Sequence, residues 1–233
     1  MSEKNRESRI GAVILMISAA VFIVTSAVAV PILARPFYHA HIQPLDLTER
    51  SGMTESQIKE TYDDVLDYCT GKTDEFSAGS LPWSEDGRAH FEDVRKLFIL
   101  DMVLALISAV ITAVVVIYCL VKRKKPYFFR GHSPGFWSSV VIGITMAVVA
   151  IVSAVNFDKA FEVFHRIFFP GKDNWILDAY TDPVILLMPQ EFFAGCAILI
   201  VAIIIVLCGA LLALDRGILY RSRRESGKNV YQK

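Results

Sequence analysis

Long apolar segments alternate with polar segments along this chain of 233 residues. Four apolar segments are almost free of charged side chains, and each is about as long as a helix that crosses a bilayer, roughly 20 residues. They comprise residues 10–33, 97–121, 136–155 and 192–214. Buried helices of soluble proteins rarely run so far without a charge. The pattern therefore predicts an all-α membrane protein with four transmembrane helices.

The first apolar segment also has features of a secretory signal peptide. Three basic residues precede it, and residues 27–29 (Ala-Val-Ala) resemble a signal-peptidase site. A cleaved signal peptide has an apolar core of about 7–15 residues, and the apolar run before Ala29 is longer than that. We therefore interpret the segment as a retained transmembrane helix.

The charges between the apolar segments predict which parts face the cytoplasm. Residues 122–135 carry five basic and no acidic side chains, and the tail 215–233 carries six basic and two acidic ones. Residues 35–96 carry thirteen acidic side chains against seven basic, and residues 156–191 carry six against three. Because cytoplasmic loops are enriched in Lys and Arg, both termini should be cytoplasmic, with residues 1–34 holding the N-terminus and the first helix. Residues 35–96 and 156–191 should form the outer side.

Composition supports the membrane class and narrows the expected partners. Hydrophobic residues make up 54% of the chain, and the mean hydropathy is +0.44. The 24 basic and 24 acidic residues cancel to a formal net charge of zero, which gives no reason to expect a nucleic-acid partner. Membrane lipid is the expected partner, and the basic tail should contact anionic headgroups. We expect a monomer without a cofactor.

The two outer segments are long enough for a small cap that leans on the membrane helices. Residues 53–71 are typical of an amphipathic helix: Thr54 and Gln57 form a capping-box pattern, and Gly71 fits its end. Its apolar face comprises Ile58, Tyr62, Val65, Leu66 and Cys69. Two prolines predict an extended stretch over residues 35–44. Ser84 is expected to cap a helix that continues into the second apolar segment.

The second outer segment is unusually rich in phenylalanine. Its aromatic positions follow helical i, i+3, i+4, i+7 spacing at Phe161, Phe164, His165 and Phe168. Residues 170–171 (Pro-Gly) should end this helix, and the apolar residues 183–189 are too few to cross a bilayer, so they should be re-entrant or interfacial. Such aromatics are common in belts at membrane interfaces. Belts are mostly Trp and Tyr, however, and phenylalanines around a histidine favour a pocket for a lipid-like substrate.

Histidines of the outer segments are the main candidates for chemistry. His90 and His165 occupy helical positions near the predicted membrane surface, and histidine can act as base and acid near neutral pH. Either could also be an ordinary hydrogen-bonded surface residue. His39 and His41 would lie on one side of an extended segment, as metal ligands require, so a metal-dependent hydrolase is an alternative.

Known hydrolase motifs do not help to identify a nucleophile. The chain contains no HExxH, paired CxxC, GxSxG or P-loop pattern, so acid/base catalysis by histidines is easier to defend than an acyl-enzyme on Ser or Cys.

Asp101 lies one turn into the second span, where a carboxylate is costly without a partner. It faces water or a cation near the boundary, or it orients a polar network below His90. A non-catalytic receptor or accessory protein is a further alternative. Because Asp101 is the only charged residue in the spans, a polar transport path is disfavoured.

Two stretches carry a family resemblance. Residues 81–98 (LPWSEDGRAHFEDVRKLF) and 157–193 contain an HFxDV element at 90–94 and an FHxxFF element at 164–169. With four spans and an outer cap, the chain resembles the bacterial lipoprotein intramolecular transacylases. Members of that family often have Asp-Pro where this chain has Asp178-Ala179, and an acid at the position of Gln190.

The resemblance implies a defined reaction. The substrate would be a lipoprotein with a diacylglyceryl-modified N-terminal cysteine, and the sn-2 acyl chain would move to the cysteine α-amino group to give the lyso form. The two catalytic histidines of the family correspond to His90 and His165. The enzyme would lie in the bacterial cytoplasmic membrane with its active site on the outer face. We expect substrate contacts from Phe164, Phe168, Phe169, Trp175, Asp93 and Asp182.

Overall fold

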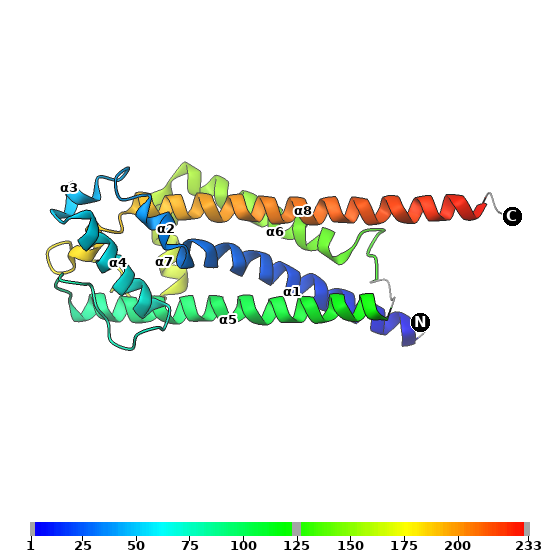
Figure 1. Ribbon diagram of the computed structural model, residues 1–233, viewed down its shortest axis with the longest axis horizontal. Coiled ribbons are helices and arrows are strands. Elements are labelled where there is room, and N and C mark those ends of the chain that lie inside the picture. Colours follow the sequence, from blue (N-terminus) through cyan, green and yellow to red (C-terminus); the bar gives the residue numbers. More distant parts are fainter. Residues whose placement is uncertain (1–2, 123–126, 231–233) are drawn as a thin grey trace. The chain divides into compact units, whose positions relative to one another are not determined.

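The computed structural model describes residues 3–122 and 127–230, with side-chain surroundings for residues 9–122 and 127–218. Nine helical elements follow one another in this part of the chain, and it contains no β-strand (Figure 1). Arg123, Lys124 and Lys125 of the predicted cytoplasmic loop lie outside the described residues. The side chains of Lys4 and Arg6, and those of most of the basic tail, lie outside them as well.

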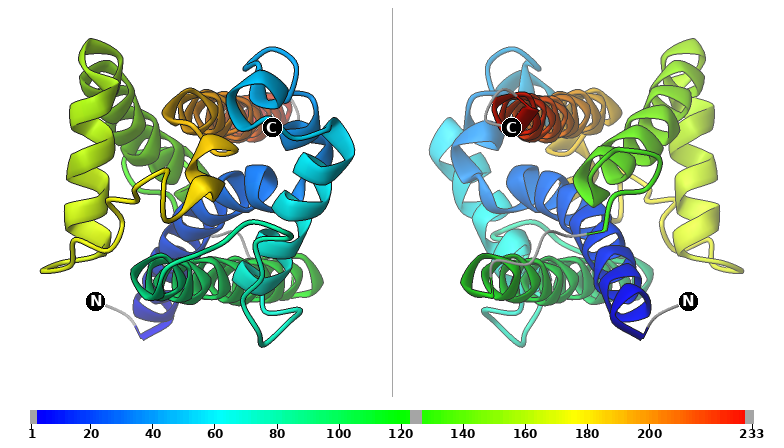
Figure 2. Two further views of the ribbon diagram at one scale, coloured as in Figure 1. Left: turned by 90° about the vertical axis from the view of Figure 1, so that its left-hand side faces the viewer. Right: turned by 90° about the vertical axis from the view of Figure 1, so that its right-hand side faces the viewer.

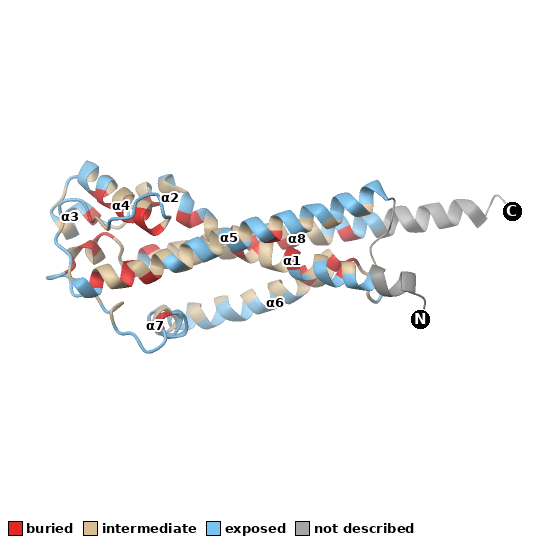
Figure 3. Ribbon diagram, turned by 90° about the horizontal axis from the view of Figure 1, so that it is seen from below, coloured by how far each residue is buried: buried red, intermediate tan, exposed pale blue. Residues whose placement is uncertain are grey.

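Four long helices contain the four predicted spans. They are α1 (Glu3–Leu33), α5 (Glu85–Val121), α6 (Pro134–Val155) and α8 (Gln190–Val230). Each is long and apolar enough to cross a membrane. Only 6% of the most apolar window of α5 is buried, and Figure 3 shows exposed residues along α5 and α6. Large aliphatic side chains exposed in this way need an apolar solvent, which confirms the predicted all-α membrane class.

The helices contribute to two compact units. The first unit comprises residues 1–26, 104–148 and 201–233, and the second comprises residues 27–103 and 149–200. Both histidines of the resemblance belong to the second unit. The first unit contains the short loop between α5 and α6.

A buried carboxylate organises the loop in the first unit. Asp215 is 1% exposed, and it accepts hydrogen bonds from Nδ1 of His132 and from the backbone N–H of Ser133, both at 2.8 Å. The Ser133 hydroxyl in turn accepts from the N–H of Phe136, and the His132 ring stacks on Phe136. Since Pro134 occupies the first position of α6, these contacts define where that helix begins.

The second unit holds five short elements. They are α2 (Arg35–His39), α3 (Leu47–Ser51), α4 (Glu55–Cys69), α7 (Phe157–Phe168) and the 3₁₀ helix η1 (Pro183–Leu186). The prediction of an extended stretch at 35–44 was wrong, because residues 35–39 are helical and a turn follows. Pro36 lies in the first turn of α2, where the missing N–H of proline costs no helical hydrogen bond.

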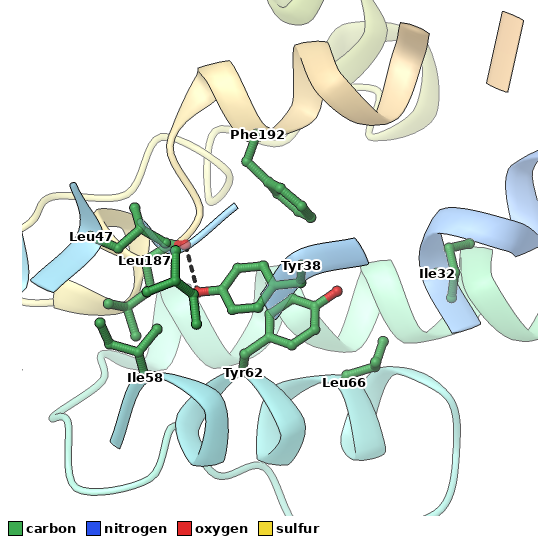
Figure 4. Packing of buried hydrophobic residues seen from close by; sticks show 9 residues of the cluster. Ile32, Tyr38, Leu47, Ile58, Tyr62, Leu66, Leu187 and Phe192 are labelled. Carbon is green, nitrogen blue, oxygen red and sulfur yellow. Dashed lines mark hydrogen bonds between the residues drawn. The ribbon is translucent and has the colours of Figure 1, made fainter. Parts of the chain in front are cut away.

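Tyr38 lies at the centre of the cap core. Its ring stacks on Tyr62 of α4 with centroids 3.5 Å apart, and its hydroxyl donates a hydrogen bond of 2.8 Å to the carbonyl of Leu187 (Figure 4). Phe192, near the start of α8, meets the Tyr38 ring edge-on at 5.1 Å. A fully buried tyrosine needs a partner for its hydroxyl. Tyr38 therefore joins α2, α4 and the segment before α8.

The amphipathic helix α4 follows its sequence signals closely. The Thr54 hydroxyl accepts from the N–H of Gln57, and the Gln57 side chain accepts from the N–H of Thr54, which confirms the capping box. Gly71 follows the helix with φ +78°, and the predicted apolar face is buried. In Figure 2, α3 and α4 lie beside η1 and the start of α8, and residues of these elements share one apolar cluster or contact one another.

The start of α5 is tied to the segment before η1. The hydroxyl and the N–H of Ser84 donate to the carboxylate of Asp182 at 2.7 and 2.8 Å. The Ser84 hydroxyl also accepts from the N–H of Gly87 at 3.0 Å, which confirms the predicted cap. A Cβ atom on Gly87 would lie 2.1 Å from Oδ1 of Asp182. Only glycine fits there while Asp182 holds this position.

Replacing Gly87 tests this close approach. We expect Gly87→Ala to displace the Asp182 carboxylate and to destabilise the fold by about 2 kcal/mol, because hydrogen bonds to a buried charged group are lost. The melting midpoint in detergent should fall by roughly 4–8 °C. Gly143→Ala in α6 is the matched control, since a Cβ there meets nothing within 4 Å. Equal midpoints for the two variants would contradict the assignment.

Candidate active site

The second unit brings His90 and His165 together. His90 lies in the second turn of α5 and His165 in the last turn of α7, and their ring centroids are 5.9 Å apart. They are 8% and 7% exposed. The amide oxygen of Asn156 accepts from the N–H of Lys159 and caps α7, and α7 then runs in a different direction from the end of α6 (Figure 1).

Aromatic rings enclose the pair. Phe161 and Trp175 lie against the His165 ring at 4.3 and 4.7 Å between centroids, with Trp175 stacked upon it. Phe169 is 3% exposed and contacts both histidines, at 5.2 Å from His90 and 5.7 Å from His165. These rings keep the site poor in water, which strengthens electrostatic interactions inside it.

The two remaining phenylalanines of the predicted set lie on the outer side of α7. The centroid of the Phe164 ring lies 5.5 Å from that of His165 and 4.6 Å from that of Phe168. Phe164 and Phe168 are each 48% exposed. They therefore extend the apolar surface of the site outward from His165. An acyl chain is the kind of ligand that such a surface fits.

A backbone contact defines the proton position on His165. Nδ1 lies 2.8 Å from the carbonyl oxygen of Phe161. A carbonyl oxygen can only accept, so Nδ1 carries the proton and donates it. In the neutral ring the lone pair is then on Nε2. The bond to Phe161 thus fixes the tautomer of neutral His165, in which Nε2 can accept a proton.

Both histidines favour the neutral state. Burial lowers the pKa of His165, although its bond to Phe161 opposes the change. His90 precedes the apolar segment 97–121. Burial, then the nearby His165, lowers the pKa of His90 to about 4, against an opposing effect of Asp93. Charging both rings is unfavourable because like charges repel in a dry site. At neutral pH both rings are therefore mainly neutral, and a second charge on the pair is disfavoured more strongly than a first.

An ion pair joins α5, which carries His90, to the loop that follows α7. Asp93, one turn after His90, is 9% exposed and accepts a hydrogen bond of 2.6 Å from Nζ of Lys172. Burial favours the neutral form of Asp93, but its bonds to Lys172 and Asn174 and the charge of Lys172 outweigh burial and lower the pKa. The indole of Trp175 donates to the carbonyl of Lys172 at 3.0 Å. The ion pair thereby holds the loop that places Trp175 on His165.

Other predicted residues lie elsewhere. The carboxylate of Asp182 is 2% exposed and bound by Ser84 and Thr181, so it positions the start of α5, and the predicted substrate contact remains a prediction. Oδ2 of Asp101 is buried without a hydrogen-bond partner, so this atom takes no part in a polar network below His90. Residues 183–189 include Val184 and Leu187, each 1% exposed in the cap core.

His39 and His41 do not share a ligand set. His39 lies 3.7 Å from Asp63, whereas Nδ1 of His41 donates to the carbonyl of Phe37 at 2.7 Å and its ring lies against Gly195. Within the described ranges, no three His, Cys, Asp or Glu side chains gather closely enough to hold a metal ion. The arrangement gives the metal-dependent alternative no set of donors there.

Sequence reasoning missed Lys172 and Asn174. Both follow the Pro-Gly break after α7, where the chain has no regular periodicity that would indicate their direction. From the sequence, Lys172 could have been identified only as a cation available to pair with an acidic residue of another segment, such as Asp93. The spacing of the phenylalanines did indicate the rings of α7 that lie beside His165.

The fold and this site define a multi-pass membrane protein whose cap encloses two histidines among aromatic rings. A family profile, lipoprotein intramolecular transacylase Lit, matches residues 13–193, a range that includes both histidines. The chain belongs to this family. It is a membrane enzyme that transfers an acyl group within a lipoprotein, which confirms the predicted fold class and activity.

Solved structures agree with the family. The chain is similar to the membrane-integral lipoprotein intramolecular transacylase Lit from Bacillus cereus, with 26% identity and a TM-score of 0.84, over 95% of this chain and 99% of that one. Two variants of that protein, with one histidine replaced by arginine or by alanine, each show 25% identity and a TM-score of 0.78. The match to the arginine variant covers 96% of this chain and 96% of the variant. The match to the alanine variant covers 95% of this chain and 97% of the variant. No curated protein sequence matches the chain.

The protonation of the histidine pair can be measured directly. We expect both rings to be mostly neutral at pH 6.5, where an ordinary histidine is half-protonated, because burial lowers both pKa values. ¹⁵N NMR of histidine-labelled protein in detergent should show this, with signals assigned from His90→Ala and His165→Ala. The His165 signal should also report a proton on Nδ1. A ring that is half-protonated at or above pH 6.5 would contradict the description of the site.

Proposed function

We propose that the chain moves the sn-2 acyl chain of a diacylglyceryl lipoprotein to the α-amino group of its N-terminal cysteine, with His165 as base and His90 as acid. The observation that carries this assignment is the bond from Nδ1 of His165 to Phe161, which leaves Nε2 as the free lone pair. A free α-amino group has a pKa of about 8, so a neutral histidine is a suitable base for it.

The bonds and protons of the reaction balance without a protein nucleophile. The amine nitrogen attacks the sn-2 ester carbonyl carbon while Nε2 of His165 takes one proton from that nitrogen. The bond between the carbonyl carbon and the glycerol oxygen then breaks, and the oxygen receives a proton from the histidine pair through His90. An amide and a free hydroxyl result. Because the pair accepts one proton and returns one, it never needs to carry two charges.

The geometry of the substrate supplies much of the rate. The amine and the ester belong to one molecule, so holding them in reacting position replaces a bimolecular encounter. The rings of Phe161, Phe169 and Trp175 limit the access of water to the ester, which disfavours hydrolysis over transfer. The outward surface of Phe164 and Phe168 offers a place for the acyl chain.

The charge pattern supports an orientation for this chemistry. Residues 122–135 and the tail are strongly basic, which favours the cytoplasmic side for both termini. The histidine pair then lies at the extracytoplasmic face of a bacterial cytoplasmic membrane, on the side with the acidic segments. The chain acts as a monomer in this proposal, since all the named groups come from one copy.

Removing either histidine should abolish most of the transfer. We expect His90→Ala and His165→Ala each to reduce transfer at least 100-fold, as general acid/base groups contribute about 10²–10⁴. Mass spectrometry of the N-terminal peptide of a co-expressed lipoprotein would detect an acyl chain on nitrogen. His41→Ala is the matched control, because His41 lies outside the pair and should retain activity. Continued formation of the lyso form by both pair variants would contradict the mechanism.

Orientation has its own test. Ser80 is exposed in the loop before α5 and Lys122 is exposed after it, so the proposal places them on opposite sides of the membrane. We expect a membrane-impermeant thiol reagent to label Ser80→Cys in intact cells, and Lys122→Cys only after permeabilisation. Labelling of Lys122→Cys alone in intact cells would reverse the orientation.

A further inference from the structure

Two buried polar atoms of the site have no hydrogen-bond partner. They are Nδ1 of His90 and Oδ1 of Asn174. A buried polar atom without a partner costs about 1–3 kcal/mol, and native proteins satisfy the great majority of such atoms. Under the proposed mechanism Nδ1 of His90 can serve the leaving oxygen, but the oxygen of Asn174 has no role in it. Its position therefore needs a reason of its own.

The surroundings of Asn174 determine which way its amide points. Its Nδ2 lies 3.5 Å from Oδ2 of Asp93. An ionised carboxylate can only accept, so the nitrogen and not the oxygen of the amide must face it. Oδ1 therefore points away from Asp93. Asp93 is one turn after His90, and Trp175, the neighbour of Asn174, stacks on His165. Asn174 therefore lies between residues that contact or adjoin the two histidines.

The contact with Asp93 does not by itself account for Asn174. At 3.5 Å it is at the long limit of a hydrogen bond, and Asp93 already accepts the shorter bond of 2.6 Å from Lys172. A leucine of similar volume would fill the same space without leaving an amide oxygen buried. The buried Oδ1 without a hydrogen-bond partner is thus the feature of Asn174 that indicates a ligand.

We propose that Oδ1 of Asn174 binds the substrate by accepting a hydrogen bond from its α-amino group. This inference rests on the proposed function. An amide oxygen selects a donor, and the α-amino nitrogen is the N–H donor that must come to the reacting ester, whereas ester oxygens can only accept. A second N–H of the same nitrogen faces His165.

The contact is compatible with each stage of the reaction. A neutral amine has two N–H bonds and one lone pair. One proton passes to Nε2 of His165, the lone pair forms the new bond to the ester carbon, and the other N–H stays with Asn174. The product amide keeps that N–H, so Asn174 needs no change in protonation. With one N–H held by Asn174 and the other aimed at His165, the lone pair has one direction left, toward the ester.

A binding cycle separates this role from a structural one. The probes are two dialkylglyceryl lipopeptides, whose ether links cannot undergo transfer: one has the cysteine α-amino group and the other has hydrogen in its place. Affinities are measured in nanodiscs for the full-length wild type, Asn174→Leu and Asn174→Ala. We expect the wild type to prefer the amino lipopeptide about tenfold, equivalent to about 1.4 kcal/mol. Both variants should lose that preference while binding the deamino lipopeptide as the wild type does.

Tyr180→Leu is the matched control, because Tyr180 is 92% exposed on the same segment, and it should retain the tenfold preference. Equal losses of affinity for both lipopeptides in the Asn174 variants would show a structural role and overturn the inference, as would an unchanged preference. The proposed function is judged separately by acyl transfer from the ester-linked lipopeptide. Wild-type transfer with the preference unchanged in the variants overturns the role of Asn174 alone, and an absence of wild-type transfer overturns the function.

Discussion

The buried pair of His90 and His165 constrains the rest of this structure, because two imidazoles among aromatic rings can hold one proton far more easily than two. The helices that carry the rings must therefore be held firmly. Asp182 and Ser84 define the start of α5, the Asp93–Lys172 ion pair links α5 to the loop after α7, and Phe161 orients His165. Each contact uses a polar group that is satisfied within the cap, as buried polar groups require. In the proposed mechanism the chemistry follows from one shared proton rather than from a protein nucleophile.

The cap supplies rigidity that the spanning helices cannot supply by burial. Side chains along α5 and α6 are largely exposed, and lipid offers them no drive to pack together beyond close contact. In the cap, Tyr38 is stacked on Tyr62 and bonded to Leu187 within a continuous apolar cluster. The histidine site thus lies outside the apolar spans, on α5, which continues into a span, and on the separate short helix α7.

The sequence predicts the features that depend on periodicity and on local caps. The four spans, the apolar face of α4, the capping box of Thr54 and the phenylalanine spacing on α7 all follow from such patterns. The two prolines of residues 35–44 favour an extended stretch, whereas Pro36 lies in the first turn of a helix, where proline is well tolerated. The contacts of Lys172 and Asn174 with Asp93, and the bonds that Ser84 donates to Asp182, join residues far apart in the chain. No local pattern encodes such pairings. The roles of the substrate-binding residues remain predictions.

The central claim is that the acyl chain passes directly from oxygen to nitrogen within one substrate molecule, by proton transfer through the histidine pair. A crossover measurement tests it most directly. Purified enzyme receives two diacylglyceryl lipopeptides of different sequence, of which one carries a deuterated sn-2 chain, and mass spectrometry follows the label. The account predicts that the deuterated chain appears on the nitrogen of its own peptide alone. Deuterated chains on the nitrogen of the other peptide would show transfer between molecules and would contradict it.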